Sequence, residues 1–260
     1  MPAEKTAAIL VIGDELLTGR TRDMNMHHLA GWLNARGVAL KEARFVGDDH
    51  EAIVSALNAL RPRYDYVFTS GGIGPTHDDI TAEAVAAAFG VPCVEHPEAI
   101  RLIEAWYGAR GEEVTPARRR MARAPQGAEL IPNPVSGAPG IRVGNVFVMA
   151  GVPRIFQGML AAVEQSIEGG ARIHSRAVTA MRLPESRIAD ALREIQTRAE
   201  GVILGSYPIE GDFKGVTIVA RSADEAAADR AAAAVAKTMR DMGFEPEMAD
   251  HRQKSDDKAR

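Results

Sequence analysis

One stretch of this 260-residue chain combines residue types that suit a charged ligand. The segment VFTSGGIGPTHDDIT, residues 67–81, joins a short apolar run to a helical pattern. Its glycines are Gly71, Gly72 and Gly74, and its aspartates are Asp78 and Asp79. Glycines expose backbone N–H groups, which attract anions, whereas carboxylates attract cations. We therefore expect a ligand that carries phosphates, together with a metal ion or a proton to be moved.

These residues also have explanations that involve no ligand. The glycines can serve only a tight strand-to-helix turn, but because a helix N-terminus follows, phosphate binding is the better interpretation. Aspartate is a common helix cap, so we expect one of Asp78 and Asp79 to cap the helix and the other to face the ligand.

Two more predicted strands end in acidic residues. Residues 7–13 continue into Asp14, and residues 38–47 continue into Asp48 and Asp49. Either Asp48 or Asp49 is equally well explained as the cap of the next helix. In an open parallel sheet, ligands bind beyond the carboxyl ends of the strands, so three polar strand ends at one edge predict an active site.

The order of apolar patterns predicts an α/β fold. Apolar runs of strand length alternate with helix-spaced patterns up to about residue 168, which indicates a mainly parallel sheet covered by helices on both faces. Residues 171–246 read as β-α-β-β-α, a small α+β unit with its helices on one side of an antiparallel sheet. The polar residues 247–260 are predicted to form a disordered tail.

Composition excludes several classes of protein. A net charge of −4 gives no basis for binding nucleic acid or an anionic membrane. The apolar runs are too short for a signal sequence or a membrane span, and the single cysteine, Cys93, fits a reducing compartment. The segment GIGPTH has His77 in place of the last glycine of a dinucleotide-binding fingerprint, and no Walker loop is present. We expect a cytoplasmic protein whose partner is a small molecule.

Several segments together resemble the MoaB/Mog-type molybdopterin-binding domain, in the branch found in CinA-like proteins. The segments are VIGDELLTG, DMN, VGDD, TSGGIGPTHDDIT and NPVSGAPG, in this order. The similarity covers residues 1–170 and implies a three-layer α/β/α domain. Residues beyond it resemble the small domain that follows in that branch.

The resemblance implies functional carboxylates at Asp48 and Asp79, which would hold a divalent metal such as Mg²⁺ or orient a water. The residues implied to bind the ligand are Asp14, Asn25, Ser70, Gly71, Gly72, Gly74, Asp78, Ser136 and Gly137. The implied activity is metal-dependent pyrophosphate hydrolysis of an ADP-ribose-like nucleotide. A molybdopterin-binding protein, adenylylating or purely binding, remains open as the alternative.

The chain also departs from the pattern of CinA-like proteins. It has arginines and Met121 in RRRMA, where those proteins usually carry an asparagine and a glutamine, and AGVPRI in place of PGVPSE. Their nicotinamide-nucleotide deamidase domain is not expected here. We also expect a homo-oligomer, because the sheet of the small unit must bury its open face.

Overall fold

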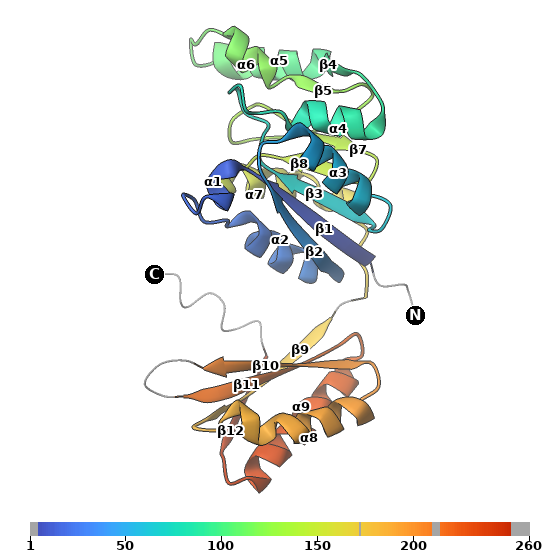
Figure 1. The fold of residues 1–260 in the computed structure, drawn as a ribbon, viewed down its shortest axis with the longest axis vertical. Helices are drawn as coiled ribbons and strands as arrows, with labels where there is room; N and C mark the ends of the chain where they lie inside the picture. Colours follow the sequence, from blue (N-terminus) through green and yellow to red (C-terminus); the bar gives the residue numbers. More distant parts are fainter. Residues whose placement is uncertain (1–4, 172, 210–213, 251–260) are drawn as a thin grey trace. The chain divides into compact units, whose positions relative to one another are not determined.

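The computed structural model describes residues 5–171, 173–209 and 214–250. The chain divides into two compact units, residues 1–170 and 171–260 (Figure 1). In the part of the chain that is described, no helix combines the length and the apolar character that crossing a membrane requires.

A six-stranded sheet forms the centre of the first unit, in the order β2-β1-β3-β8-β7-β6. Its strands are β1 (Lys5–Ile12), β2 (Val38–Val46), β3 (Tyr66–Ser70), β6 (Glu129–Ile131), β7 (Gly140–Val143) and β8 (Val146–Met149). The pairs among β2, β1, β3 and β8 are parallel, whereas β7 and β6 are antiparallel additions at one edge. The sheet is therefore mainly parallel, as predicted.

Helices cover both faces of this sheet and bury two apolar cores. Helices α3 (His50–Leu60) and α4 (Thr81–Phe89) pack on one face, and α2 (Asn25–Asn34) and α7 (Pro153–Ala162) pack on the other. Alternate residues of β1 contribute to the two cores, which explains why the strand reads as a continuous apolar run. This is the three-layer α/β/α arrangement implied by the resemblance.

Shorter elements surround the central sheet. They are α1 (Asp14–Leu17), β4 (Cys93–Glu95), α5 (Pro97–Gly108), α6 (Pro116–Arg120), β5 (Arg123–Pro125) and a 3-10 turn at Glu164–Ser166. Strands β4 and β5 pair with each other, and α5 packs through Ala99 and Ile103 against Ala122, just before β5. This arrangement holds the end of α5 and the segment after α6 in fixed positions.

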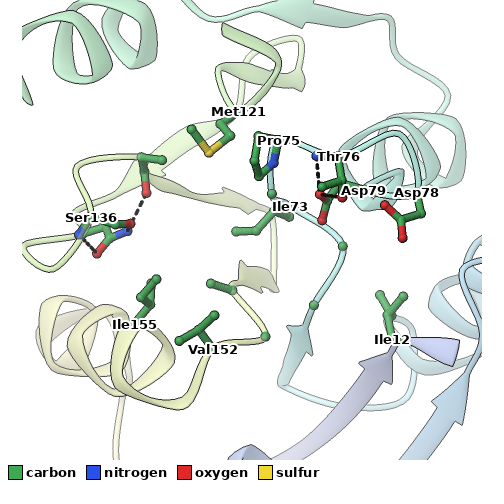
Figure 2. A pocket seen from close by; sticks show the side chains of 18 of the residues that line it. Ile12, Ile73, Pro75, Thr76, Asp78, Asp79, Met121, Ser136, Val152 and Ile155 are labelled. Carbon is green, nitrogen blue, oxygen red and sulfur yellow. Dashed lines mark hydrogen bonds between the residues drawn. The ribbon is translucent and has the colours of Figure 1, made fainter. Parts of the chain in front are cut away.

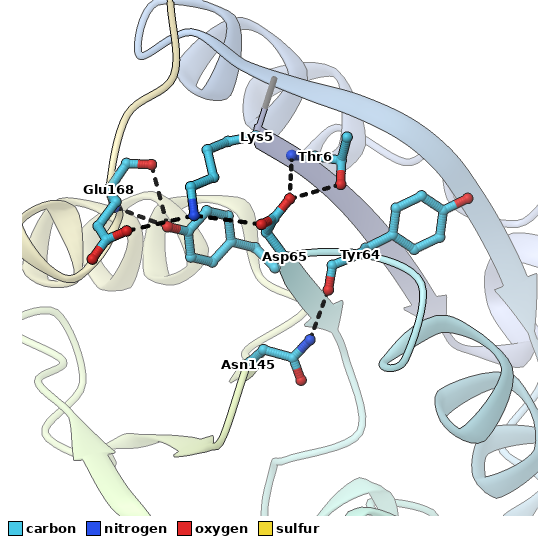
Figure 3. A network of polar contacts seen from close by, with 7 residues as sticks. Lys5, Thr6, Tyr64, Asp65, Asn145 and Glu168 are labelled. Carbon is cyan, nitrogen blue, oxygen red and sulfur yellow. Dashed lines mark hydrogen bonds and ion pairs between the residues drawn. The ribbon is translucent and has the colours of Figure 1, made fainter. Parts of the chain in front are cut away.

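A polar network closes the amino ends of the strands (Figure 3). The carboxylate of Asp65 accepts hydrogen bonds from the Thr6 N–H at 2.8 Å and the Thr6 hydroxyl at 2.9 Å, and it pairs with Lys5. The Thr6 N–H is the largest influence that lowers the pKa of Asp65. The Tyr66 hydroxyl accepts from the Glu168 N–H at 2.9 Å. The polar side chains at this end of the sheet are thus bonded to one another and to the backbone.

The second unit is a four-stranded antiparallel sheet with two helices. Its elements are β9 (His174–Met181), α8 (Glu185–Arg198), β10 (Val202–Ile209), β11 (Gly215–Ser222), α9 (Glu225–Asp241) and β12 (Pro246–Asp250). The sheet order is β10-β11-β9-β12, and both helices share a single core with the sheet. The prediction of a disordered tail was wrong for residues 247–250, because they form part of β12 and pair with β9. The neighbouring strand stabilises a strand conformation that the polar sequence of these residues does not indicate. Residues 251–260 lie outside the described residues.

Candidate functional site

A cavity of about 480 Å³ opens at the carboxyl ends of the parallel strands (Figure 2). Its lining includes Gly13 after β1, Asp48 after β2 and Gly71 after β3, so all three predicted strand ends meet there. Gly151, which follows β8, brings a fourth strand end to the cavity. The cavity therefore lies where an open parallel sheet places its ligands.

The glycine segment makes a turn that only glycine accommodates. Gly71 and Gly72 have φ angles of 112° and 68°, and a side chain on Gly71 would overlap the carbonyl oxygen of Ile12. The buried Thr81 fixes the turn, since its hydroxyl donates to the Gly71 carbonyl at 3.0 Å and its N–H donates to the Gly72 carbonyl at 2.9 Å. Three residues that line the cavity, Gly72, Ile73 and Gly74, have backbone N–H groups that donate to no acceptor within the described residues. Those N–H groups remain for a ligand.

Asp79 anchors the segment that follows the turn. Its Oδ2 accepts hydrogen bonds from the Thr76 N–H at 2.8 Å and from the Thr76 hydroxyl (Figure 2). The prediction that Asp78 or Asp79 caps the next helix was wrong, because α4 begins at Thr81, its N-cap residue is Ile80, and no side chain caps it. Both aspartates line the cavity instead.

Asp49 and Asp48 have separate tasks. Asp49 caps α3 by accepting from the Ala52 N–H at 2.7 Å, which leaves Asp48 to line the cavity. The Oδ2 of Asp48 accepts from the Asp14 N–H at 3.0 Å, and Asp14 Oδ1 accepts from the Asp48 N–H at 3.3 Å. Asp14, which was predicted to bind the ligand, is exposed and does not line the cavity. Its neighbour Glu15 lines the cavity instead.

Burial raises the pKa of Asp48 above its ordinary value of 3.8. The Asp14 N–H opposes this effect, and the negative charges of Asp14, Glu15 and Asp78 add to it. An acid whose pKa rises on folding stabilises the folded chain at pH values below its ordinary pKa and loses that contribution as the pH rises through the raised value. At neutral pH, the ionised Asp48 therefore costs stability.

We expect Asp48→Asn to raise the melting temperature at pH 7 by about 1–3 °C, because it removes the buried charge and keeps an oxygen for the Asp14 N–H. Melting curves from pH 7 down to pH 3.5 should show the difference shrinking in acid, where both chains are neutral at this position. Asp49→Asn is the matched control and should change little, since asparagine caps helices about as well. A less stable Asp48→Asn at pH 7 would contradict this account.

Asn25 and Ser70, predicted to bind ligand, lie behind the cavity. Both are buried, with 3% and 2% of their surface exposed, and neither lines the cavity. The Nδ2 of Asn25 donates to Ser70 Oγ at 2.8 Å and to the Gly151 carbonyl at 2.7 Å. Through these bonds they brace the segments that follow β3 and β8.

The segment NPVSGAPG contributes through its asparagine. Asn133 and Ser136 line the cavity, and Asn133 Nδ2 donates to Ser136 Oγ at 2.6 Å. Its Oδ1 accepts from the Val135 and Ser136 N–H groups, which closes the turn. Gly137, predicted to bind ligand, lies outside the lining, and its φ of 75° lets it pack where a side chain would overlap Trp106. Asn133 was not predicted from the sequence, although the Asn-Pro pair, a turn signal, could have indicated it.

An apolar wall completes the cavity, although from the sequence Met121 and the segment AGVPRI were noted only as departures from related proteins. It consists of Tyr107, Met121, Val152, Ile155 and Met159. Figure 2 shows Val152 and Ile155 on one side of the cavity, with Asp78 and Asp79 on the other. The site thus joins an apolar surface to a polar one, as sites for ring-bearing ligands commonly do.

The charged side chains that line the cavity are all acidic. It includes the carboxylates of Glu15, Asp48, Asp78 and Asp79, and no lysine, arginine or histidine. Within the described ranges, no group of three or more His, Cys, Asp or Glu side chains is placed to hold a metal by itself. Mg²⁺ is commonly held by one or two carboxylates together with water and ligand phosphates. The residues therefore fit a cation that is shared with a ligand.

Known proteins share this architecture. Residues 8–168 match a family model described as a probable molybdopterin binding domain, and residues 172–247 match the FAD synthase middle domain. A Pyrobaculum calidifontis protein is 36% identical over 211 residues, which cover 78% of this chain and 80% of the relative. A CinA-like protein of Anaeromyxobacter is 38% identical over 208 residues, 76% of this chain and 50% of that relative. This chain thus spans about half the length of that CinA-like relative.

A solved structure agrees with these matches. The crystal structure of the protein CinA from Thermoplasma acidophilum covers 62% of this chain and 97% of its own, with 33% identity and a TM-score of 0.58. The family match covers more than half of the chain and contains every residue that lines the cavity. The chain therefore belongs to the family of molybdopterin-binding-domain proteins, in its CinA-like branch.

Proposed function

We propose that the first unit binds a nucleotide that carries a pyrophosphate, similar to ADP-ribose, and hydrolyses the pyrophosphate with the help of a divalent metal ion. In this reaction a water oxygen forms a bond to one phosphorus, and the bond from that phosphorus to the bridging oxygen breaks. ADP-ribose would yield AMP and ribose 5-phosphate.

One observation carries the proposal: free N–H groups at the glycine turn share a cavity with four carboxylates and with no basic side chain. The N–H groups favour phosphate, and the carboxylates repel it. A phosphate can be bound beside that many negative charges when a cation lies between them. The lining therefore favours a phosphate-bearing ligand that enters together with a metal ion.

The chain's own residues have distinct tasks in this proposal. Gly72, Ile73 and Gly74 donate their N–H groups to phosphate oxygens, and the apolar wall takes the ring of the ligand. Asp48 and Asp79 hold the cation, which, when bound, neutralises phosphate charge and makes a water more acidic.

A molybdopterin-binding protein, adenylylating or purely binding, is the second candidate. It is favoured by the description of the matching family model as a probable molybdopterin binding domain. A pterin carries both a ring and a phosphate, so the same apolar wall and glycine turn would serve it.

Turnover distinguishes the two candidates. The chain is incubated with ADP-ribose and Mg²⁺ or Mn²⁺, and AMP and ribose 5-phosphate are measured by chromatography. We expect both products in equal amounts, and none after the metal is removed with EDTA. Binding of molybdopterin by calorimetry, without any metal-dependent release of AMP, would contradict the hydrolase proposal and support the second candidate.

A further inference from the structure

The glycine turn has a second face, which is lined by two arginines and two acidic side chains. A smaller depression there shares Gly72, Ile73, Gly74, Asp79 and Met121 with the main cavity. Its remaining lining includes Arg120 at the end of α6, Arg123 in β5 and Glu83 in α4. Arg120 and Arg123 therefore line one depression with the three residues whose N–H groups have no acceptor in the described part of the chain.

Neighbouring arginines are already paired with acids. Arg118 pairs with Glu112 and lies over the Tyr107 ring, with its guanidinium carbon 3.9 Å from the ring centre. Arg119 makes two hydrogen bonds to Glu95, of 2.8 and 3.0 Å.

Arg123, the other arginine of the depression, pairs with Glu83. Arg120 has no hydrogen bond, ion pair or ring contact within the part of the chain that the structure describes. It forms no ion pair with Asp79, although both line the depression. An exposed guanidinium beside free backbone N–H groups is a common way to bind phosphate oxygens.

We propose that Arg120 binds an oxygen of the ligand's phosphate group from the α6 side of the glycine turn. It would select ligands whose anionic group reaches past Gly74, with the metal ion on the carboxylate side. The inference rests on the proposed phosphate-binding function. It adds a binding residue and a requirement for a diphosphate or a similar extended anion.

The test measures binding of two probes, inorganic pyrophosphate and ADP-ribose, each with Mg²⁺, to the full chain by calorimetry. We expect Arg120→Ala to weaken both probes about 10- to 100-fold, the usual effect of losing a charge-assisted hydrogen bond. Arg120→Lys should recover only part of this loss, since lysine keeps the charge without the planar fork. Arg119→Ala is the matched control on the same helix and should change either Kd less than about 2-fold.

The outcomes separate this inference from the proposed function. Unchanged binding in Arg120→Ala, or equal weakening in Arg119→Ala, overturns the role of Arg120, and ADP-ribose binding by the parent would leave the proposed function standing. Pyrophosphate binding that depends on Arg120, without ADP-ribose binding, supports Arg120 and counts against the proposed substrate. A parent chain that binds neither probe overturns both. Melting temperatures of all variants exclude misfolding as the cause.

Discussion

Asp79→Asn is expected to lower the turnover of ADP-ribose by about 100-fold or more while the melting temperature stays within about 3 °C. Asparagine keeps an oxygen that can accept from the Thr76 N–H and hydroxyl, so the anchored segment is retained. The negative charge that would hold a divalent metal is lost. Initial rates across a range of Mg²⁺ concentrations, together with melting curves, measure both effects.

Two further variants make the result specific. Asp78 lines the same cavity but is exposed, and the Thr76 N–H donates to Asp79 instead. Asp78→Asn should therefore reduce turnover by less than about 10-fold. Asp79→Ala removes the acceptor as well as the charge, so it should also lower the melting temperature. If Asp79→Asn turns over ADP-ribose as fast as the parent, Asp79 holds neither the metal nor the water.

The local sequence was sufficient to predict the structure where a segment determines its own geometry. The apolar run of β1 reflects burial on both faces, and the glycines after β3 adopt the positive φ angles that their residue type allows. Asp49 was one of two candidates for the cap of α3, and its hydrogen bond to the Ala52 N–H settles the choice. In each case the relevant contacts lie within a few residues along the chain.

The features that the sequence did not predict depend on contacts between segments that are distant along the chain. Asn25 was predicted to bind the ligand, but its bonds to Ser70 and to Gly151, which is 126 positions away, place it behind the cavity. Tyr107 and Met121 reach the cavity because α5 and the segment after α6 share a small core. The start of α4 lies beyond both aspartates, so cap preferences alone misplaced it.

Gly72→Val is expected to abolish measurable binding of Mg²⁺-pyrophosphate and to lower the melting temperature as well. A valine at a φ of 68° is strained, at a cost of about 1–2 kcal/mol. Its Cβ would also overlap the hydroxyl of Thr81, which is buried and donates to the Gly71 carbonyl. Because this bond fixes the turn, its loss displaces the N–H groups that we propose for the phosphate. Calorimetry and melting curves on the same samples report both effects.

Gly90→Val separates strain from loss of the phosphate site. Gly90 ends α4 with the same φ of 68°, but a Cβ there would meet no atom within 4 Å, and the residue lies outside the cavity. This variant should lose about 1–2 kcal/mol of stability and bind pyrophosphate like the parent. Comparable losses of binding in both variants would trace the defect to general destabilisation. A Gly72→Val chain that binds as tightly as the parent would show that the turn does not hold the phosphate, because the overlap with Thr81 cannot be avoided without moving it.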